Sequence, residues 1–276
     1  MKKFVVVALA AAIGVLAVFS AASAQTASEA RIRVLHASPD APAVDIFLDG
    51  QKAITNLAFD SITDYVSVPA GAHNVKVFPA PSDGTGTAVI EADVTLSAGT
   101  DYTVAAVGKL SEIGPLVLTD DNKAPAEGQV RLRFVHASPD APAVDIYAEG
   151  GGVVVPNAAF KAASGYLDLP AGTYNLEVRA AGTETVALDL PGIALEKGKV
   201  YTAFAVGLLQ GQPALKAKLV VDATAPAAPP ASGVGSLDGS SGSATWVWLL
   251  AIGAGLAGLV LAGGVGTLAT VRMRRR

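Results

Sequence analysis

Hydrophobic and polar residues alternate in short runs through residues 31–221, and turn-forming residues separate the runs. Val75 and Val77 alternate with polar neighbours, as Leu176 and Val178 do in a second, similar run. Alternation with a period of two is typical of a strand that buries one face. No amphipathic helical pattern stands out in this region, so the pattern predicts an all-β structure.

Turn residues fall where such strands would end. Asp49-Gly50 is suited to a two-residue hairpin turn, and Pro69-Ala70-Gly71 and Pro170-Ala171-Gly172 each precede a run of alternating residues. About seven short strands in roughly 95 residues, separated by regular turns, are typical of an antiparallel β-sandwich of the Ig-like or transthyretin-like kind. A small β-barrel is the alternative.

The pattern occurs twice along the chain. The run RIRVLHASPDAPAVDIFLDG begins at Arg31, and RLRFVHASPDAPAVDIYAEG begins at Arg131. Within them the eleven residues HASPDAPAVDI are identical and lie 100 positions apart. A repeat of this length indicates duplicated domains and is too long for a solenoid. We therefore expect two tandem domains, at residues 30–121 and 129–222.

Residues 31–46 contain the repeated stretch and can be interpreted strand by strand. Alternation places Ile32, Val34 and His36 on the apolar face of a strand and the two arginines between them on the other. The residues Ser38-Pro39-Asp40-Ala41 then form a turn, because proline favours its second position. A second strand follows, with Asp45 on the face opposite to its apolar neighbours.

Two interpretations of this stretch remain open. In the first, it is a structural turn whose histidine, serine and aspartates bond to nearby backbone. In the second, one imidazole and two carboxylates begin a cation site, although zinc and calcium both need more ligands than one copy offers. The weak metal candidates are His36, Asp40, Asp45, His136, Asp140 and Asp145. We expect no catalytic residue and no cofactor, because the chain lacks phosphate-loop, zinc-protease and nucleophile–base patterns.

The N-terminal segment has the layout of an export signal. Residues 1–24 begin with a basic pair, continue as an apolar run and end with Ala22-Ser23-Ala24, which predicts a signal peptide cut before Gln25. The apolar run, residues 4–19, is shorter than the roughly 20 residues that a membrane-crossing helix needs. An uncleaved N-terminal anchor is therefore the weaker alternative.

The C-terminal segment predicts a membrane anchor. Residues 246–271 contain no charge, begin with two tryptophans near the expected interface and precede the basic tail of residues 272–276. This predicts a single-pass transmembrane helix in the membrane lipid of the cell, with the tail in the cytoplasm and the repeats outside. The Pro/Gly/Ser-rich residues 223–245 then form a stalk. A wall-sorting signal is the alternative, although the LPxTG pattern is absent.

One face of the predicted helix carries small residues at four-residue spacing: Ala254, Gly258, Ala262 and Gly266. Such a face lets two helices approach closely and suggests a homodimer. Membrane helices are also generally rich in glycine and alanine, which is the simpler explanation.

Charge narrows the choice of partners. The two end segments hold six of the 20 basic residues and no acidic residue, which leaves 14 basic and 24 acidic side chains between them. An acidic exterior repels phosphate backbones, so we expect no nucleic-acid partner. The chain contains no cysteine, so each exported domain depends on its own core for stability.

Together, HASPDAPAVDI, the PAG turns and the strand YTxxAVG resemble the bacterial domain of unknown function family 4397, across both copies. The resemblance implies an exported protein with tandem β-rich domains and assigns no site residue. We expect a non-enzymatic cell-surface role in adhesion, envelope structure or protein interaction, with an unknown surface protein or glycan as partner. The alternative is a module that binds a cation, glycan or small ligand through loops beside the repeated turn.

Overall fold

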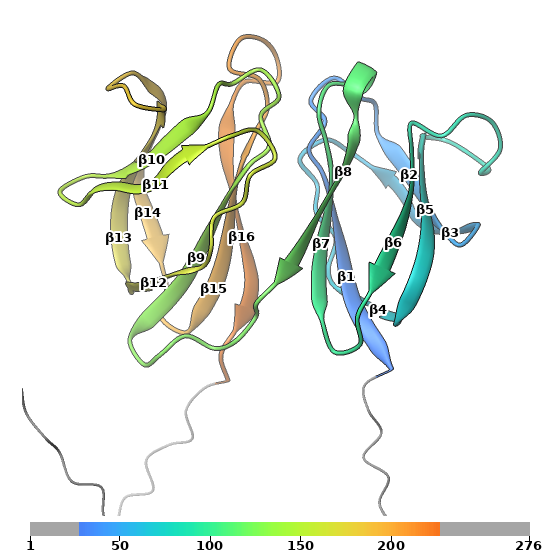
Figure 1. The fold of residues 1–276 in the computed structure, drawn as a ribbon, viewed down its shortest axis with the longest axis horizontal. Helices are drawn as coiled ribbons and strands as arrows, with labels where there is room; N and C mark the ends of the chain where they lie inside the picture. Colours follow the sequence, from blue (N-terminus) through green and yellow to red (C-terminus); the bar gives the residue numbers. More distant parts are fainter. Residues whose placement is uncertain (1–27, 227–276) are drawn as a thin grey trace, which may run out of the picture. The chain divides into compact units, whose positions relative to one another are not determined.

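A computed structural model describes residues 28–226, which form β-strands and one short 3₁₀ turn at Leu110–Glu112 (Figure 1). The predicted signal peptide, transmembrane helix with its small-residue face, and basic tail lie outside the described residues, as does most of the predicted stalk. Within residues 28–226, no helix is long and apolar enough to cross a membrane.

Each copy of the sequence repeat forms eight strands. Repeat 1 consists of β1 (Glu29–His36), β2 (Val44–Leu48), β3 (Gln51–Leu57), β4 (Val66–Pro69), β5 (Gly71–Pro79), β6 (Ile90–Leu96), β7 (Asp101–Val107) and β8 (Gly114–Asp120). Repeat 2 consists of β9 (Gln129–His136), β10 (Val144–Ala148), β11 (Gly152–Ala158), β12 (Leu167–Pro170), β13 (Gly172–Ala180), β14 (Val186–Leu195), β15 (Lys199–Val206) and β16 (Lys216–Thr224).

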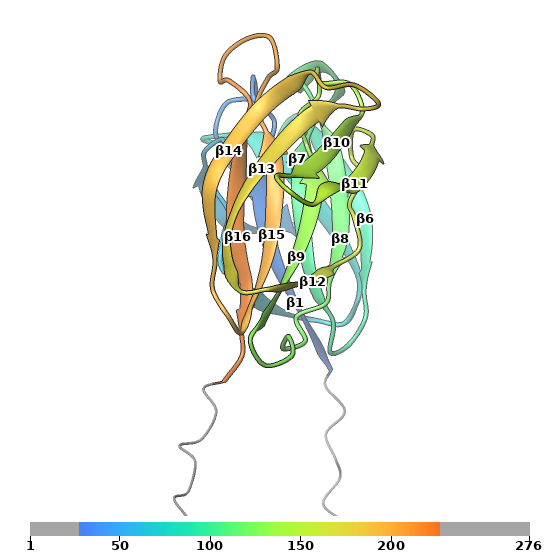
Figure 2. The same ribbon diagram turned by 90° about the vertical axis from the view of Figure 1, so that its left-hand side faces the viewer.

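The eight strands of a repeat form two four-stranded sheets. Repeat 1 has the sheets β4-β1-β7-β8 and β3-β2-β5-β6, and repeat 2 has the corresponding sheets β12-β9-β15-β16 and β11-β10-β13-β14. Figure 2 shows the two layers of repeat 2, with β10, β11, β13 and β14 in front of β9, β15 and β16. The prediction of an all-β structure with two sandwich-like pairs of sheets is confirmed.

The prediction that the sandwiches are antiparallel throughout is wrong at one place in each repeat. Strand β1 runs parallel to β7, and β9 runs parallel to β15. Parallel neighbours need a long connection between them, and five other strands separate each of these pairs in the chain. Alternation within a strand gives no information on the direction of its neighbour, so the sequence pattern could not reveal this pairing.

The predicted hairpin at Asp49-Gly50 is confirmed. Leu48 on β2 pairs with Gln51 on β3, which leaves a two-residue turn. Both turn residues have positive φ, 50° and 78°. This is the backbone that two-residue hairpins require and that Asp-Gly adopts readily.

The two repeats share a hydrophobic cluster in addition to their own cores. Repeat 1 contributes residues of β1, β7 and β8 to this cluster, and repeat 2 contributes residues of β9 and β15. Leu35, Phe204 and Val206 are each fully buried in it. The second face of the β1 sheet is therefore covered by the other repeat rather than by solvent.

Candidate functional site

The repeated histidine is buried at the end of the first strand of each repeat. The ring nitrogen Nε2 of His36 lies 2.9 Å from the carbonyl oxygen of Pro42, so the ring donates there, and Nδ1 accepts from the Ser38 N–H at 3.3 Å. His136 makes the same two contacts at 3.0 and 3.3 Å. Burial lowers the pKa of both histidines, which favours the neutral ring.

The first aspartate of the stretch fastens a distant loop. The carboxylate of Asp40 accepts a hydrogen bond from the backbone N–H of Leu110 at 2.7 Å. Asp140 accepts two, from Leu209 at 2.7 Å and Gln210 at 2.9 Å. Burial opposes ionisation of Asp140, but these N–H groups outweigh it and lower the pKa of the carboxyl.

The second aspartate lies buried on the second strand and collects backbone donors. Asp45 accepts from the N–H groups of Asn56 at 2.7 Å and Ser82 at 2.9 Å, and from the Lys52 ammonium at 3.0 Å. The backbone donors, which are the main cause, lower the pKa of Asp45 to about 2.

Repeat 2 keeps this arrangement with one difference. Asp145 accepts from the N–H groups of Asn157 and Gly182, at 2.6 and 2.8 Å, and these donors lower the pKa of its carboxyl. Val153 is the residue of repeat 2 that corresponds to Lys52. Lys52 pairs with Phe47, the fourth residue of β2, and Val153 pairs with Tyr147, the fourth residue of β10. The lysine contact therefore belongs to repeat 1.

The six metal candidates thus point to separate partners. In each repeat the histidine bonds within its own turn. The first aspartate bonds to the loop that follows the seventh strand of its repeat. The second aspartate bonds to the third strand and to the loop after the fifth strand. Among residues 28–226, no group of three or more His, Asp and Glu side chains is placed to hold a metal ion. The geometry agrees with the structural-turn interpretation and gives no support to the cation-site interpretation.

A buried ion pair that the sequence analysis did not predict joins the repeats. Arg33 is 3% exposed, and its Nη2 donates to Asp222 of repeat 2 at 2.5 Å. Its Nε donates to the hydroxyl of Thr103 at 2.8 Å, and its guanidinium lies over the Tyr65 ring, 4.6 Å from the centroid. Arg33 is therefore held by both repeats.

The same ion pair is formed in the opposite direction. Arg133 donates from Nη2 to Asp120 of repeat 1 at 2.6 Å and from Nε to Thr202 of its own repeat at 3.1 Å. It lies over the Tyr166 ring at 4.7 Å. Each repeat thus supplies one arginine to the other and receives one in return, and we call the set the reciprocal ion-pair network.

The carboxylates in this network are fully hydrogen-bonded. Asp120 also accepts from the hydroxyls of Thr103 and Tyr65, both at 2.6 Å. Asp222 accepts from the equivalent residues of repeat 2 at 2.5 and 3.2 Å. Buried charges need such partners, because an unpaired charge in the interior is strongly destabilising.

Burial and charge act in opposite directions on these groups. Burial disfavours the Arg33 guanidinium, but the charge of Asp222 outweighs it and raises the pKa of the arginine. Burial raises the pKa of the Tyr65 and Tyr166 hydroxyls. For Asp222, burial outweighs the nearby arginines and raises the pKa of the carboxyl. Arg33 therefore stays charged and the two tyrosines stay neutral. The sequence feature that could have revealed this network is the recurrence of Arg, Tyr, Thr and Asp at equivalent positions of both repeats.

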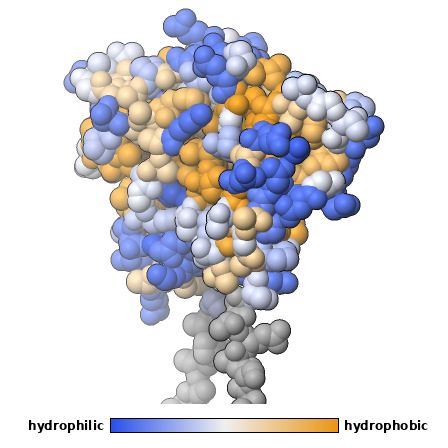
Figure 3. All heavy atoms as spheres, turned by 45° about the vertical axis from the view of Figure 1, so that its right-hand side comes forward, coloured by the Kyte–Doolittle hydropathy of each residue, from blue (hydrophilic) through white to orange (hydrophobic). Residues whose placement is uncertain are grey.

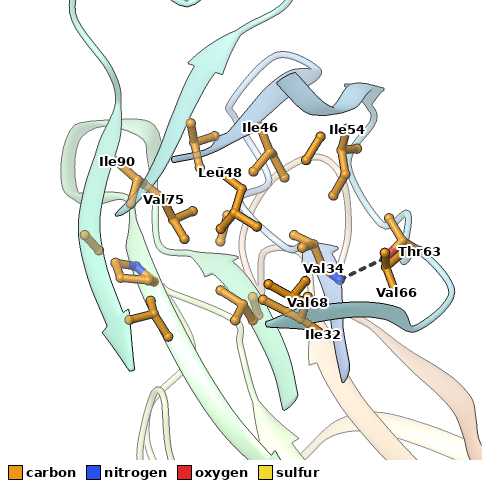
Figure 4. A pocket seen from close by; sticks show the side chains of 18 of the residues that line it. Ile32, Val34, Ile46, Leu48, Ile54, Thr63, Val66, Val68, Val75 and Ile90 are labelled. Atoms are coloured by element: carbon orange, nitrogen blue, oxygen red, sulfur yellow. Dashed lines mark hydrogen bonds between the residues drawn. The ribbon is translucent and has the colours of Figure 1, made fainter. Parts of the chain in front are cut away.

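A cavity of about 610 Å³ lies between the two sheets of repeat 1. Figure 4 shows aliphatic side chains of the two sheets pointing toward one another across it, among them Ile32, Val34, Ile46, Leu48, Val75 and Ile90. Its wall contains no aromatic ring, and its one charged residue, Asp64, is exposed. This size is within the range of small-molecule sites, roughly 300 to 1,000 Å³.

The repeat 1 cavity reaches the surface along β3 and β4. Ala53 and Thr55 on β3, and Ser67 and Pro69 on β4, are exposed residues of its wall. Val66 is 58% exposed. Figure 3 shows a face of the molecule on which apolar side chains come to the surface between polar ones. The interior is therefore accessible from outside between two sheet edges.

In repeat 2 the corresponding space is filled. The cavity there has a volume of about 30 Å³. Phe134 in repeat 2 corresponds to Val34 in repeat 1. Leu190 corresponds to Ala92, because Ala92 pairs with Val75 and Leu190 pairs with Leu176, the residue of β13 that matches Val75. The larger side chains at these positions contribute to the difference in volume, although Leu48 of repeat 1 is matched by the smaller Ala148 in repeat 2.

The family model described as Domain of unknown function (DUF4397) matches the chain twice, at residues 30–147 and 135–241. No curated protein matches the chain.

Solved structures show weak similarity. The Bacillus anthracis TIE protein is 15% identical with a TM-score of 0.20, over 66% of this chain and 34% of its own. A family 26 carbohydrate-binding module of Eubacterium rectale, in complex with maltoheptaose, is 13% identical with a TM-score of 0.22, over 72% and 98%. A putative cell adhesion protein of Parabacteroides distasonis is 9% identical with a TM-score of 0.20, over 71% and 99%. This chain spans about a third of the TIE protein, and at these TM-scores the similarities carry no information on function.

Proposed function

Because the chain belongs to the family of the Domain of unknown function (DUF4397), in tandem, we propose that it displays its two β-sandwich repeats as one block outside the cell. The role is non-enzymatic: adhesion, envelope structure or interaction with a surface protein or glycan. The predicted signal peptide, stalk and single-pass anchor of residues 246–271 would place the block there, with the basic tail in the cytoplasm.

The reciprocal ion-pair network is the observation that carries this proposal. Arg33 and Arg133 are each 3% exposed, and each pairs with an aspartate of the other repeat. Separating the repeats would expose or unpair these charges, which is costly. Two repeats fixed in this way present one continuous surface, which suits a displayed binding or structural element.

The repeated turn supports the non-enzymatic role. His36, Asp40 and Asp45 all bond to backbone groups, and a reacting side chain would need to be free to meet a substrate. Binding of a cation, glycan or small ligand through loops beside this turn is the alternative. Thermal unfolding with chelator and with Ca²⁺, Zn²⁺ or Mn²⁺ tests the cation case. A native-state ligand at a hundredfold excess over its Kd would add about 2.7 kcal/mol of stability.

The location can be tested with single cysteines, because the chain has none of its own. Val153, which is 51% exposed on repeat 2, and Met273, in the predicted tail, are suitable sites. In intact cells, a membrane-impermeant maleimide should label Val153→Cys and should label Met273→Cys only after the membrane is permeabilised. Labelling of Met273→Cys in intact cells, or protection of Val153→Cys, would contradict the proposed display.

A further inference from the structure

We propose that the repeat 1 cavity binds the aliphatic chain of a single-chain amphiphile with an uncharged head group. This activity goes beyond the displayed block, because it belongs to the interior of one repeat. The proposal rests on the size of the repeat 1 cavity, the chemistry of its wall, its access from outside and the much smaller cavity in repeat 2.

The wall selects hydrocarbon over other ligands. Its interior residues are aliphatic, and it offers no aromatic ring on which a sugar could stack. The hydroxyl of Thr63 is already used, since it accepts from the Val34 N–H at 3.0 Å and donates to the Asp64 carbonyl at 2.9 Å. Among the described residues, the buried side-chain atoms without a partner belong to Ser38, Asp60 and Asn122, none of which lines the cavity.

These features exclude a polar guest from the interior. Burying an amide or hydroxyl without a hydrogen-bond partner costs several kcal/mol, about 2 to 7 depending on the reference. A peptide segment would bring one amide per residue into an interior lined by aliphatic side chains, whereas the hydroxyls of Thr55 and Ser67 belong to exposed residues at the sheet edges. A flexible hydrocarbon chain brings no amide and can follow an irregular aliphatic wall.

The volume fits one chain. Taking for each methylene the roughly 30 Å³ that a water molecule occupies in the liquid, 610 Å³ accommodates on the order of 15 to 20 groups. Two chains of that length would not fit together, which favours a single-chain amphiphile over a membrane lipid that inserts both of its chains. The head group would remain outside, between the edges of β3 and β4.

The charge near the opening selects the head group. Asp64 is the one charged residue of the wall and is exposed. A carboxylate or phosphate head would lie near a like charge, whereas an alcohol or glycerol head would not. We expect a preference of about threefold to fivefold for the uncharged head, because an exposed charge acts weakly through water.

The test is photolabelling of the full chain in its membrane. The probe is a 16-carbon alcohol with a diazirine at mid-chain, and peptides are mapped by mass spectrometry after illumination. Label should appear in peptides of β1, β2, β5 and β6 and be at least tenfold lower in those of β9, β10, β13 and β14. Equal labelling of the two repeats, or none in repeat 1, would overturn the proposal.

Matched variants localise the signal. Val34→Phe with Ala92→Leu gives repeat 1 the residues of repeat 2 and should reduce its labelling at least tenfold. Phe134→Val with Leu190→Ala does the reverse and should create labelling in repeat 2. Thermal unfolding of each variant establishes that it is folded. If the filled variant is folded and still labelled in repeat 1, the cavity is not the site.

Further arms distinguish the ligand and its source. The equivalent fatty acid should label less than the alcohol, and Asp64→Asn should reduce that difference; an equal or stronger signal from the acid in the original chain would refute the head-group preference. A diazirine-bearing phosphatidylcholine in vesicles should label repeat 1 less than the alcohol does. Labelling that appears only when residues 246–271 are removed would overturn the proposal in favour of that segment as occupant.

Discussion

Repeats 1 and 2 place the same eight strands and the same repeated turn around cavities of about 610 and 30 Å³. The histidines of their turns make matching hydrogen bonds, and their arginines make matching ion pairs. The interior between the sheets differs, and the substitutions there include Val34 against Phe134 and Ala92 against Leu190. The repeated turn and the reciprocal ion-pair network are therefore common to both repeats. The arrangement of the eight strands does not depend on how completely the interior between the sheets is filled.

The largest effect should come from breaking the reciprocal network. Arg33→Met leaves Asp222 buried without its nearest cation, and Arg133→Met does the same to Asp120, so each should lower the free energy of unfolding by about 3 to 5 kcal/mol. Urea unfolding of the fragment spanning residues 25–244 measures this loss.

Lys76→Met is the control, since the Lys76 and Glu91 side chains pair at the surface and are 38% and 56% exposed. Its cost should be below about 1 kcal/mol. If Arg33→Met or Arg133→Met lowers the free energy of unfolding only slightly, the two halves of the network do not both stabilise the protein, which would contradict this account.

The second effect concerns the interior. Leu190→Ala should destabilise repeat 2 by about 1 to 3 kcal/mol, because the half-buried leucine packs against the core of that repeat. Ala92→Leu should stabilise repeat 1 by about 0.5 to 2 kcal/mol, because the leucine enters space that is already present. The same unfolding experiment measures both.

Val153→Ala, at an exposed position of repeat 2, should change stability by no more than about 0.5 kcal/mol. A loss of more than about 1 kcal/mol in Ala92→Leu would indicate an overpacked site and would contradict an open interior.

The third effect is on pH dependence and also separates the repeats. The lowered pKa values of His36 and His136 mean that the unfolded chain takes up protons first, so their contribution to stability is lost as pH falls below about 6.5. His73 belongs to repeat 1 alone. Its bond to Asp49, 2.7 Å long, is the main cause that raises its pKa. Its contribution is full below about pH 6.5 and is lost as pH rises through the raised value.

His73→Tyr, which installs the repeat 2 residue, should therefore increase the loss of stability between pH 7 and pH 5. Unfolding curves at both pH values measure this change. An unchanged or smaller loss on acidification would mean that His73 is not the opposing group.

The smallest effect should come from Lys52→Val, which gives Asp45 the surroundings of Asp145. The lysine side chain is 34% exposed, so its removal should cost less than about 1 kcal/mol. Asp45→Ala leaves two backbone N–H groups without a partner and should cost about 2 to 4 kcal/mol. Similar costs in urea unfolding would mean that the lysine, rather than the backbone, holds this carboxylate.

The strands, one hairpin and the tandem repeat could be predicted from local sequence. Alternation identified the strands, Asp49-Gly50 identified a hairpin, and identical runs identified the tandem repeat. The buried network could not be predicted, because alternation places Arg33 opposite Val34 but does not say what covers each face. In the structure Arg33 is buried by the other repeat, whereas Val34 is half-buried beside the cavity.

The interior was equally hidden in the sequence. Whether Val34 and Ala92 leave space depends on the register between β5 and β6 and on which sheets face each other. Neither follows from a single strand. The metal candidates show the same limit, since a histidine and two aspartates close in sequence bond to three different segments.

One repeat has an open apolar interior of about 610 Å³, whereas the cavity in its duplicate has a volume of about 30 Å³. The most direct test is a crystal of residues 25–244 derivatised with xenon, which enters apolar cavities that are free of water. We predict anomalous density for xenon among Val34, Leu48 and Val75 in repeat 1 and none at the matching place in repeat 2. Density in both repeats, or in neither, would contradict the account.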